Sequence, residues 1–164
     1  MFSEYYKFMD KKCDACEFLE APNEKTRILL TDNWDVGVGN NQAYFGRAYA
    51  TLRNHKSSLG SLSQEEWHDF ENVVQRLEEA YTAVYGAEPL NWSCCMNFAF
   101  REEPFNPHVH WHIYPRYKNA PEINGVTYED VQFGSMYDVE AERLVDDNTV
   151  EAIAYKLREY LENN

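Results

Sequence analysis

Three of the chain's five histidines stand at alternate positions in the stretch PFNPHVHWHIYPRY, as His108, His110 and His112. Successive side chains of a β-strand point to opposite faces, so a strand here would present all three imidazoles on one face. Imidazoles in such a row suit transition-metal binding or the handling of phosphate. The structural alternative is an edge strand whose polar face merely happens to use histidine, and the small number of histidines disfavours it. The residues between them would point into a core: Val109, Trp111 and Ile113.

A second group of possible metal ligands lies near the start of the chain. Cys13 and Cys16, in CDAC, have the two-residue spacing of many zinc sites. The pair alone is weak evidence, because a CxxC is also found as a redox pair or by chance. Cys94 and Cys95 are adjacent on an expected strand, so they face opposite sides and cannot easily share a metal. We interpret these two as core thiols.

Length and composition limit the class of protein. The chain has 164 residues, 44% of them hydrophobic and 15% aromatic, which indicates one globular domain over 1–164. Its formal net charge of -13 repels nucleic-acid polymers and anionic membranes. No apolar run has the length of a membrane span, and the first residues do not resemble a secretory signal. We therefore expect a cytoplasmic protein, in which structural disulfides are rare.

Hydrophobic periodicity predicts the elements that must position these residues. Residues 25–40 read as two strands with a turn at Asp32–Asn33, and strands are also expected within 43–53, 90–100 and 108–116, of which 90–100 is taken as an inner strand. Residues 61–86 predict a long helix that begins with a Ser63–Glu66 capping box and ends at Gly86. A second amphipathic helix is expected in 149–164, and 117–147 reads mostly as loop. The expected apolar stripe of the long helix is Trp67, Phe70, Val74, Leu77, Tyr81 and Val84, and that of the last helix is Val150, Ile153, Ala154, Leu157 and Leu161.

HVHWHIYPR resembles the motif of the histidine triad family, His-x-His-x-His followed by two apolar residues. The Pro-Arg ending is most similar to the dinucleoside polyphosphate hydrolase branch. Asn97 lies eleven residues before His108, where the family keeps an Asn or Gln. The resemblance covers about 13–117 and leaves 118–164 as a C-terminal extension. It implies an α+β fold with an antiparallel sheet of about five strands, the long helix on one face, a C-terminal helix, and a twofold homodimer.

The resemblance also implies a catalytic set of His108, His110, His112 and Asn97. His110 would attack the α-phosphorus of a nucleotide, such as a dinucleoside polyphosphate, and water would then hydrolyse the nucleotidyl-histidine intermediate. His112 would donate a hydrogen bond to a phosphate oxygen. Asn97 would act on the ester or ribose side. No metal is needed for the chemical step in this scheme.

A structural zinc site is implied by the same resemblance. Its ligands would be Cys13, Cys16, His55 and His108, because bacterial family members hold one zinc with two cysteines, a histidine after the central strand and the first triad histidine. Two sulfurs and two nitrogens suit tetrahedral zinc, and four protein ligands close the site. Zinc would connect the N-terminal arm to the strand that carries the histidines.

The sequence departs from the family near the phosphate. The Ser or Thr usually found three residues before the first triad histidine is Phe105 here, and Asn106 is the candidate substitute. The usual Gly-His before the central strand is Gly46-Arg47. Arg47 would supply positive charge near the phosphate, or would simply be solvated.

Further nucleotide-binding residues are expected on either side of the motif. Asn40 is our candidate for the ribose contact, with Asp35 as a less favoured alternative. Arg116 would reach a distal phosphate, or would be a surface arginine paired with one of the many acids.

Other functions compete with hydrolysis. The altered EEPFNP loop is compatible with a nucleotide-binding protein that has little turnover. A second alternative is a metal-dependent hydrolase in which the three histidines bind a catalytic metal. The cysteine pair and Asn97 have no role in that alternative. Phosphorolysis in place of hydrolysis is a variation within the family. The sequence does not name the base or the leaving group.

Overall fold

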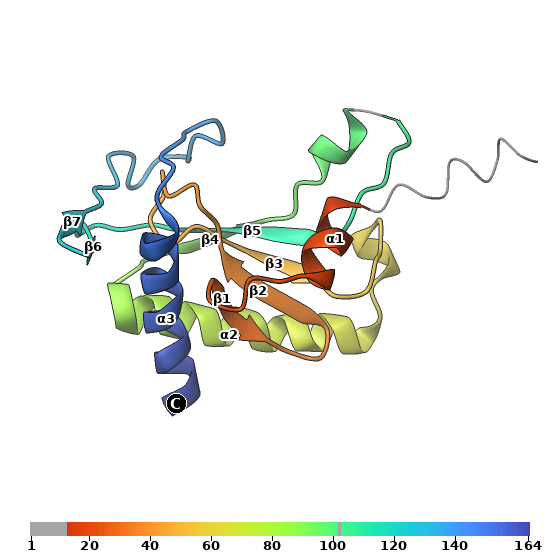
Figure 1. Cartoon of the computed structure of the whole chain (residues 1–164), viewed down its shortest axis with the longest axis horizontal. Helices are drawn as coiled ribbons and strands as arrows, with labels where there is room; N and C mark the ends of the chain where they lie inside the picture. Colours follow the sequence, from red (N-terminus) through yellow and green to blue (C-terminus); the bar gives the residue numbers. More distant parts are fainter. Residues whose placement is uncertain (1–12, 102) are drawn as a thin grey trace, which may run out of the picture.

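The computed structural model describes residues 13–101 and 103–164. The N-terminal residues that bear on a signal sequence lie outside this range. The described elements follow one another along the chain in Figure 1. They are α1 (Asp14–Glu20), β1 (Arg27–Leu30), β2 (Trp34–Val38), β3 (Ala48–Leu52), η2 (Leu59–Ser61), α2 (Gln64–Tyr85), β4 (Leu90–Ser93), η3 (Asn97–Phe100), β5 (His110–Pro115), β6 (Glu122–Ile123), β7 (Val126–Thr127) and α3 (Asp147–Asn163).

The architecture is α+β, as predicted, with a five-stranded antiparallel sheet in the order β1-β2-β3-β5-β4. The histidine strand β5 lies between β3 and β4, and in the β3 pairing Thr51 is opposite His110 and Tyr49 is opposite His112. Helix α2 runs along one face of the sheet in Figure 1, while α1 and the loop that carries η3 lie on the other side. His110 and His112 are therefore held by a strand with a neighbour on each side, and His108 lies just before this strand.

Helix α2 forms for the reasons that its sequence suggests. Ser63 caps it, and the reciprocal Ser63–Glu66 capping box is present. Gly86 ends it at a φ of 70°, in the left-handed conformation that glycine adopts most easily. The predicted stripe is shifted slightly, because Val73 is fully buried while Trp67 remains 40% exposed. Trp111 of β5 stacks on Phe70 at a centroid distance of 4.8 Å, which joins this helix to the histidine strand.

Helix α3 packs against β1, β2 and α2. All five residues of its predicted apolar stripe are buried: Val150, Ile153, Ala154, Leu157 and Leu161. The segment between β5 and α3 is mostly irregular, as expected, and contains only the short β6–β7 hairpin as a second sheet. Val109 and Ile113 are fully buried and Trp111 is partly buried against the core, which confirms that the residues alternating with the histidines point into the core.

Two expectations about strands were wrong. Residues 90–100 contain an edge strand, β4, and not an inner one, and the chain leaves the sheet after Ser93 and forms the 3-10 helix η3. The strand expected within 43–53 is shorter, because the chain turns at Gly46, where φ is 76°, before β3 begins. Among the described residues, no helix combines the length and the apolar character needed to cross a membrane.

Candidate functional site

The geometry of β5 fixes the tautomer of His110. Its Nδ1 lies 2.8 Å from the backbone carbonyl oxygen of His108. A carbonyl oxygen only accepts hydrogen bonds, so this Nδ1 carries the proton and the Nε2 of neutral His110 has a free lone pair. The Nε2 of His112 is 3.1 Å away and donates to that lone pair. The pair thus presents a nucleophilic nitrogen beside a hydrogen-bond donor.

His112 is held neutral by its surroundings. Burial lowers its pKa to about 4, and repulsion from the protonated form of His110 and from Arg47 acts in the same direction, against a smaller opposing effect of the Cys95 backbone. Its Nδ1 is enclosed, and no described residue forms a hydrogen bond of good geometry with it, although the Cys95 backbone lies near enough to affect the pKa. A neutral His112 can donate only through Nε2, which points toward His110 and the site.

Two cavities flank this histidine pair. The first, of about 400 Å³, is lined by His110 and by mostly apolar residues of α1, β2 and β3. Phe18, Val38 and Tyr49 are among its walls, and Gly39 lies opposite the Tyr49 ring. A Cβ at position 39 would come within 2.7 Å of Tyr49 Cε2, so glycine is what allows this ring to pack here. The chemistry of these walls suits a planar, weakly polar group.

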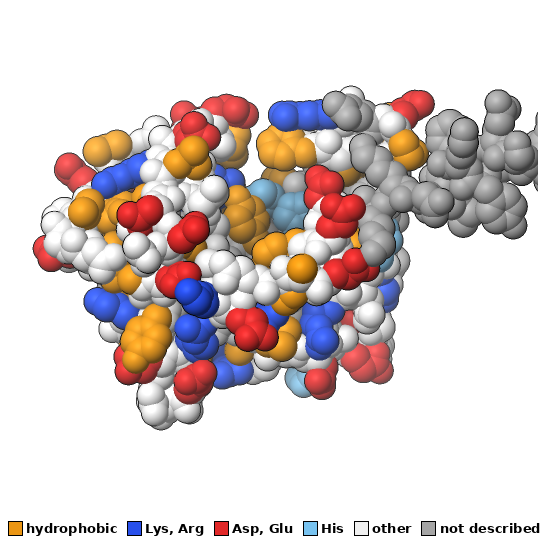
Figure 2. Space-filling view, in the orientation of Figure 1, with side chains coloured by type: hydrophobic (Ala, Val, Ile, Leu, Met, Phe, Trp, Pro, Cys, Tyr) orange, Lys and Arg blue, Asp and Glu red, His pale blue; other side chains and the backbone are white. Residues whose placement is uncertain are grey.

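The second cavity, of about 320 Å³, lies on the His112 side and is more polar. Arg47 and Arg101 contribute two cations, and Glu140 contributes one acid. Figure 2 shows histidine side chains in a hollow between two raised walls of the molecule. The other lining residues are Ser93, Cys95, Asn97, Phe98, Tyr114 and Val139.

The predicted zinc ligands converge at one point. One donor atom from each of Cys13, Cys16, His55 and His108 lies within 4.8 Å of all the others. The Nδ1 atoms of His55 and His108 are 3.2 Å apart, and each is 3.2 Å from Cys13 Sγ. His108 Nε2 is 2.6 Å from the carbonyl oxygen of Leu52 and donates to it, which leaves Nδ1 free to bind a metal. The donor set and its convergence fit a tetrahedral zinc ion.

Several other predicted residues also lie near the histidines. Asn97 is exposed at the start of η3 and lines the second cavity together with His112. Asn106 is partly buried in the loop before β5, and Phe105 beside it is 49% exposed and packs on Phe100. The interpretation of Cys95 as a core thiol was wrong, because this residue is exposed at the second cavity. The chain turns out of the sheet before Cys95, which is why strand alternation does not describe it.

Three predicted nucleotide-binding residues are not brought to the cavities. Arg116 is buried and bonds both carboxylate oxygens of Asp130, at 2.7 and 2.9 Å, so it is neither a free phosphate ligand nor a surface residue. Asp35 is buried and paired with Arg27 at 2.8 Å. Asn40 is exposed just beyond Gly39, and its backbone carbonyl accepts a hydrogen bond from Val145.

The structure adds residues that the sequence analysis missed. Tyr49 and Tyr114 border the site, with Tyr49 edge-on to the His112 ring at 5.1 Å and Tyr114 parallel to it at 6.2 Å. Strand alternation places Tyr49 on the same face as Arg47, and Tyr114 follows His112 by two residues, so both could have been found from the pattern. Phe18 could not, because nothing in the sequence shows that α1 folds back over β2.

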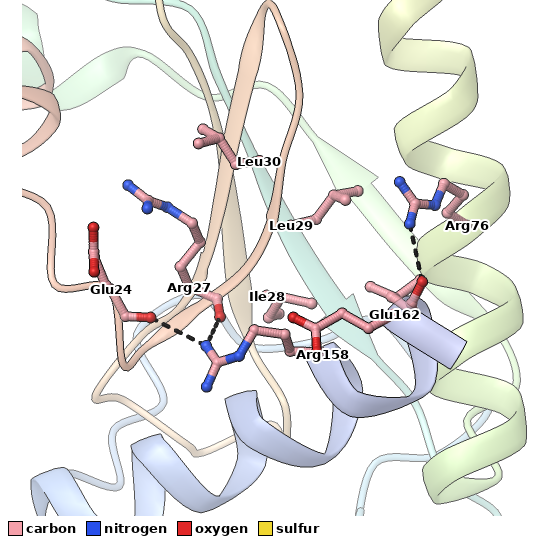
Figure 3. Close-up of a pocket in the computed structure, with 9 residues that line it drawn as sticks. Glu24, Arg27, Ile28, Leu29, Leu30, Arg76, Arg158 and Glu162 are labelled. Carbon is pink, nitrogen blue, oxygen red and sulfur yellow. Dashed lines mark hydrogen bonds between the residues drawn. The ribbon is translucent and has the colours of Figure 1, made fainter. Parts of the chain in front are cut away.

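A separate hollow of about 590 Å³ lies between β1, α2 and α3 (Figure 3). Its arginines already have partners, since Arg158 bonds the Glu24 and Arg27 carbonyls and Arg76 bonds the Leu161 carbonyl. Arg27 itself is paired with Asp35. No histidine or cysteine is among its described lining residues, so the reactive groups lie at the other site.

Several solved protein structures are similar in fold to this chain. A zinc-bound histidine triad family protein from Mycobacterium smegmatis matches with 17% identity and a TM-score of 0.59, over 93% of this chain and 98% of that one. A diadenosine triphosphate hydrolase from Plasmodium falciparum, solved with cyclomarin A, matches with 16% identity and a TM-score of 0.60, over 87% and 80%. A uridylyltransferase matches with 19% identity and a TM-score of 0.64, over 99% of this chain and 48% of that one.

This chain therefore spans about half the length of that uridylyltransferase. No protein-family model matches the sequence, and no curated protein matches it. At the identities of the solved structures, the likeness establishes the architecture and not the activity. The chain has the fold of the histidine triad proteins.

Proposed function

We propose that the chain is a nucleotidyl hydrolase or transferase that works through a nucleotidyl-His110 intermediate. The observation that carries this proposal is the His110–His112 pair, in which a carbonyl fixes the His110 tautomer and a neutral imidazole donor stands 3.1 Å from the nucleophilic nitrogen. Both solved enzymes described above share this fold and act on nucleotides by name. A nucleophilic imidazole divides one difficult displacement at phosphorus into two easier ones.

The reaction follows from the positions of these groups. A nucleoside lies in the apolar cavity beside His110, and its α-phosphate lies over the histidine pair. His110 Nε2 forms a bond to phosphorus, and the bond from phosphorus to the leaving group breaks. The Nδ1 proton of His110 stays hydrogen bonded to the His108 carbonyl, which disperses the positive charge that the ring gains. The Nε2–H of His112 donates to a phosphate oxygen in this step.

A second displacement frees the enzyme. Water attacks the nucleotidyl-histidine, releases a nucleoside monophosphate and returns the lone pair to His110 Nε2. A phosphate-containing acceptor in place of water gives a transferase or a phosphorylase. Asn97, at the rim of the His112 cavity, orients the ester or the ribose. The substrate class closest to the family resemblance is the dinucleoside polyphosphates.

Zinc has a structural role in this proposal. Cys13, Cys16, His55 and His108 would hold it, and the ion would supply a closed tetrahedral link between α1 and β5. Catalysis by the three histidines as one metal site is less well supported. His108 directs Nδ1 to the cysteines and Nε2 to the Leu52 carbonyl, so neither nitrogen remains for a site shared with His110 and His112.

The family resemblance also implies a homodimer, and the absence of a recognisable secretory signal or membrane span from the sequence led us to expect a cytoplasmic location. Both stay predictions. The native mass decides the first: a monomer has 19.3 kDa. Fractionation of the cells that produce the protein decides the second.

The decisive experiment compares His110→Ala with wild type on diadenosine polyphosphates and on their uridine counterparts. We expect the variant to lose at least about a thousandfold in turnover while it still melts cooperatively and binds nucleotide. His68→Ala, at an exposed histidine of α2 that the mechanism does not use, is the matched control. Denatured, quenched wild-type enzyme should carry the nucleotidyl group on His110.

Each alternative has its own outcome. Near wild-type turnover by His110→Ala refutes the nucleophile. A nucleotidyl-His110 that forms once and is not released shows a nucleotide-binding protein with little turnover. Nucleoside diphosphate formed on addition of inorganic phosphate shows phosphorolysis.

A further inference from the structure

Arg47 is a buried cation that has no anionic partner among the described residues. The residue is only 9% exposed, and its Nε is enclosed without a hydrogen-bond partner among the described residues. Within residues 13–101 and 103–164, no carboxylate forms an ion pair with its guanidinium and no group accepts a hydrogen bond from it. The chain is rich in acids, with 28 in the full sequence, and none of those in the part of the chain that the structure describes is paired with this arginine. Buried charges are normally paired, because burial removes their hydration.

Aromatic rings hold this guanidinium in place. Its Cζ lies 4.9 Å from the centroid of Tyr114 and 5.5 Å from that of Tyr49. Cation–π contacts of this kind offset only part of the lost hydration, since they satisfy none of the N–H donors. Arg116 is a useful contrast, because it is also buried but has Asp130 and two carbonyls as partners. The fold therefore positions Arg47 firmly and leaves its donors to a ligand.

The ligand must be an anion that enters the second cavity. Arg47 lines this cavity together with His112, a second cation, Arg101, and one acid, Glu140, whereas His110 lines the apolar cavity. If the nucleoside occupies the apolar cavity and its α-phosphate lies over His110, the part of the substrate beyond that phosphate extends past His112. That part is the leaving group.

We propose that Arg47 binds a phosphate of the leaving group, and that the chain therefore selects nucleotides joined through a phosphoanhydride over nucleotides with an uncharged leaving group. This inference rests on the function proposed above and narrows its substrate class. The guanidinium donates two parallel hydrogen bonds to two oxygens of that phosphate, which suits the planar fork of arginine. In the displacement, the P–O bond to this phosphate breaks, and Arg47 stabilises the negative charge that the departing oxygen gains.

The kinetic test uses two substrates that share a nucleoside. One is diadenosine triphosphate, and the other is the p-nitrophenyl ester of adenosine monophosphate, whose leaving group has no phosphate. We expect Arg47→Met to lower kcat/KM for diadenosine triphosphate about a hundredfold. The ratio of kcat/KM for diadenosine triphosphate to kcat/KM for the p-nitrophenyl ester should fall at least thirtyfold. Arg47→Lys keeps the charge but loses the fork, and should lower the ratio about tenfold. Arg143→Gln removes an arginine that lies over Tyr128 at 3.9 Å, away from the second cavity, and is the matched control.

Equal losses on both substrates would overturn the proposal, because they would place Arg47 on the α-phosphate or in a structural role. If wild type turns over neither of these substrates nor their uridine counterparts, the proposed function itself is wrong. In that case, the anion site at Arg47 can still be tested by the binding of inorganic phosphate. Inorganic phosphate should raise the melting temperature of wild type and of Arg143→Gln, and should raise that of Arg47→Met and Arg47→Gln much less. Equal shifts in all four proteins would overturn the anion site independently of any activity.

Discussion

At the scale of single residues, the two facing imidazoles of β5 differ in what surrounds them. His110 has a carbonyl that holds its Nδ1 proton, whereas His112 has an enclosed Nδ1 without a partner among the described residues. The pKa of His112 is lowered to about 4, chiefly by burial. The donor role of His112 therefore does not depend on its being charged, and it persists throughout the neutral pH range.

This difference predicts a pH-dependent stability. In the unfolded chain His112 titrates near its ordinary pKa of 6.5, and in the folded chain near 4. Between these values the unfolded state binds more protons, so the free energy of unfolding falls as the pH is lowered from about 6.5 to 4. Glutamine does not titrate, so the fall in the free energy of unfolding across this window should be smaller in His112→Gln than in wild type. We expect the difference to be about 1–2 kcal/mol, a value reduced to allow for the partial exposure of His112 to solvent.

Urea unfolding at a series of pH values measures this effect. The difference between wild type and variant matters, because the many carboxylates titrate in both proteins. His68→Gln, at an exposed position of α2, is the matched control. Parallel stability curves for wild type and His112→Gln would show that His112 is not held neutral by the fold.

Residue identities in the site were predictable to different degrees. His110, His112 and Asn97 lie in a recognisable motif, and the structure brings them together. Arg116 lies in the same motif, but its role as a nucleotide ligand could not be judged from the sequence. Its partner Asp130 is in a segment without periodicity, so no pattern shows that the two meet. The missing partner of Arg47 is likewise visible only once the chain is folded.

At the scale of elements, the zinc ligands connect three pieces of the chain. Cys13 and Cys16 lie at the start of α1, His55 follows β3, and His108 precedes β5. Helix α1 has only seven residues and none of them is buried, so apolar packing alone holds it weakly. Its Phe18 is a wall of the cavity beside His110. The metal site is therefore expected to fix both the helix and one side of the nucleoside cavity.

The prediction at this scale is that the protein holds about one zinc per chain and depends on it. Cys13→Ser, Cys16→Ser and His55→Ala should each lower the zinc content and the melting temperature, because metal binding contributes to the free energy of folding. Turnover should fall only indirectly, unlike in His110→Ala. Metal analysis of protein purified without chelator and thermal unfolding provide the measurements.

Cys95→Ser is the control for loss of a thiol, since Cys95 is exposed and lies outside the ligand set. Metal-free protein, together with ligand variants that melt like wild type, would leave Cys13 and Cys16 without a metal-binding role.

The predicted helices and strands were confirmed where the sequence carried a strong local signal, such as a capping residue or a proline. The Ser63 cap, Gly86 and the 3.6-residue periodicity placed α2 within three residues at its start and one at its end, and Pro115 marked the last residue of β5. They were wrong at 90–100, where apolar residues favoured an inner strand. Apolar Phe98 and Phe100 are in fact exposed on η3, where Phe98 lines the second cavity, so burial did not determine their conformation.

At the scale of the whole molecule, the resemblance divides the chain into a core of about 13–117 and an extension of 118–164. The structure shows how closely the two pack. Helix α3 contacts β1, β2 and α2, and Tyr85 of α2 donates a hydrogen bond to the Ile153 carbonyl. Apolar residues of α3 belong to the same buried cluster as those of the sheet. The hydrophobic core therefore continues across residue 117, where the resemblance to the family ends.

This shared core predicts that the chain unfolds as one unit. Leu157 of α3 is fully buried, so Leu157→Ala should lower the free energy of unfolding by about 2–5 kcal/mol, as expected for a cavity in a packed core. Leu144→Ala provides the matched control, because Leu144 is 61% exposed and should contribute less than about 0.5 kcal/mol. Urea unfolding followed by tryptophan fluorescence and by circular dichroism should give coincident single transitions in both variants. The four tryptophans all precede the extension, so fluorescence reports on the sheet and α2 while circular dichroism also reports on α3. If Leu157→Ala shifts only the circular dichroism transition, then α3 unfolds separately and the chain has two cooperative units, not one.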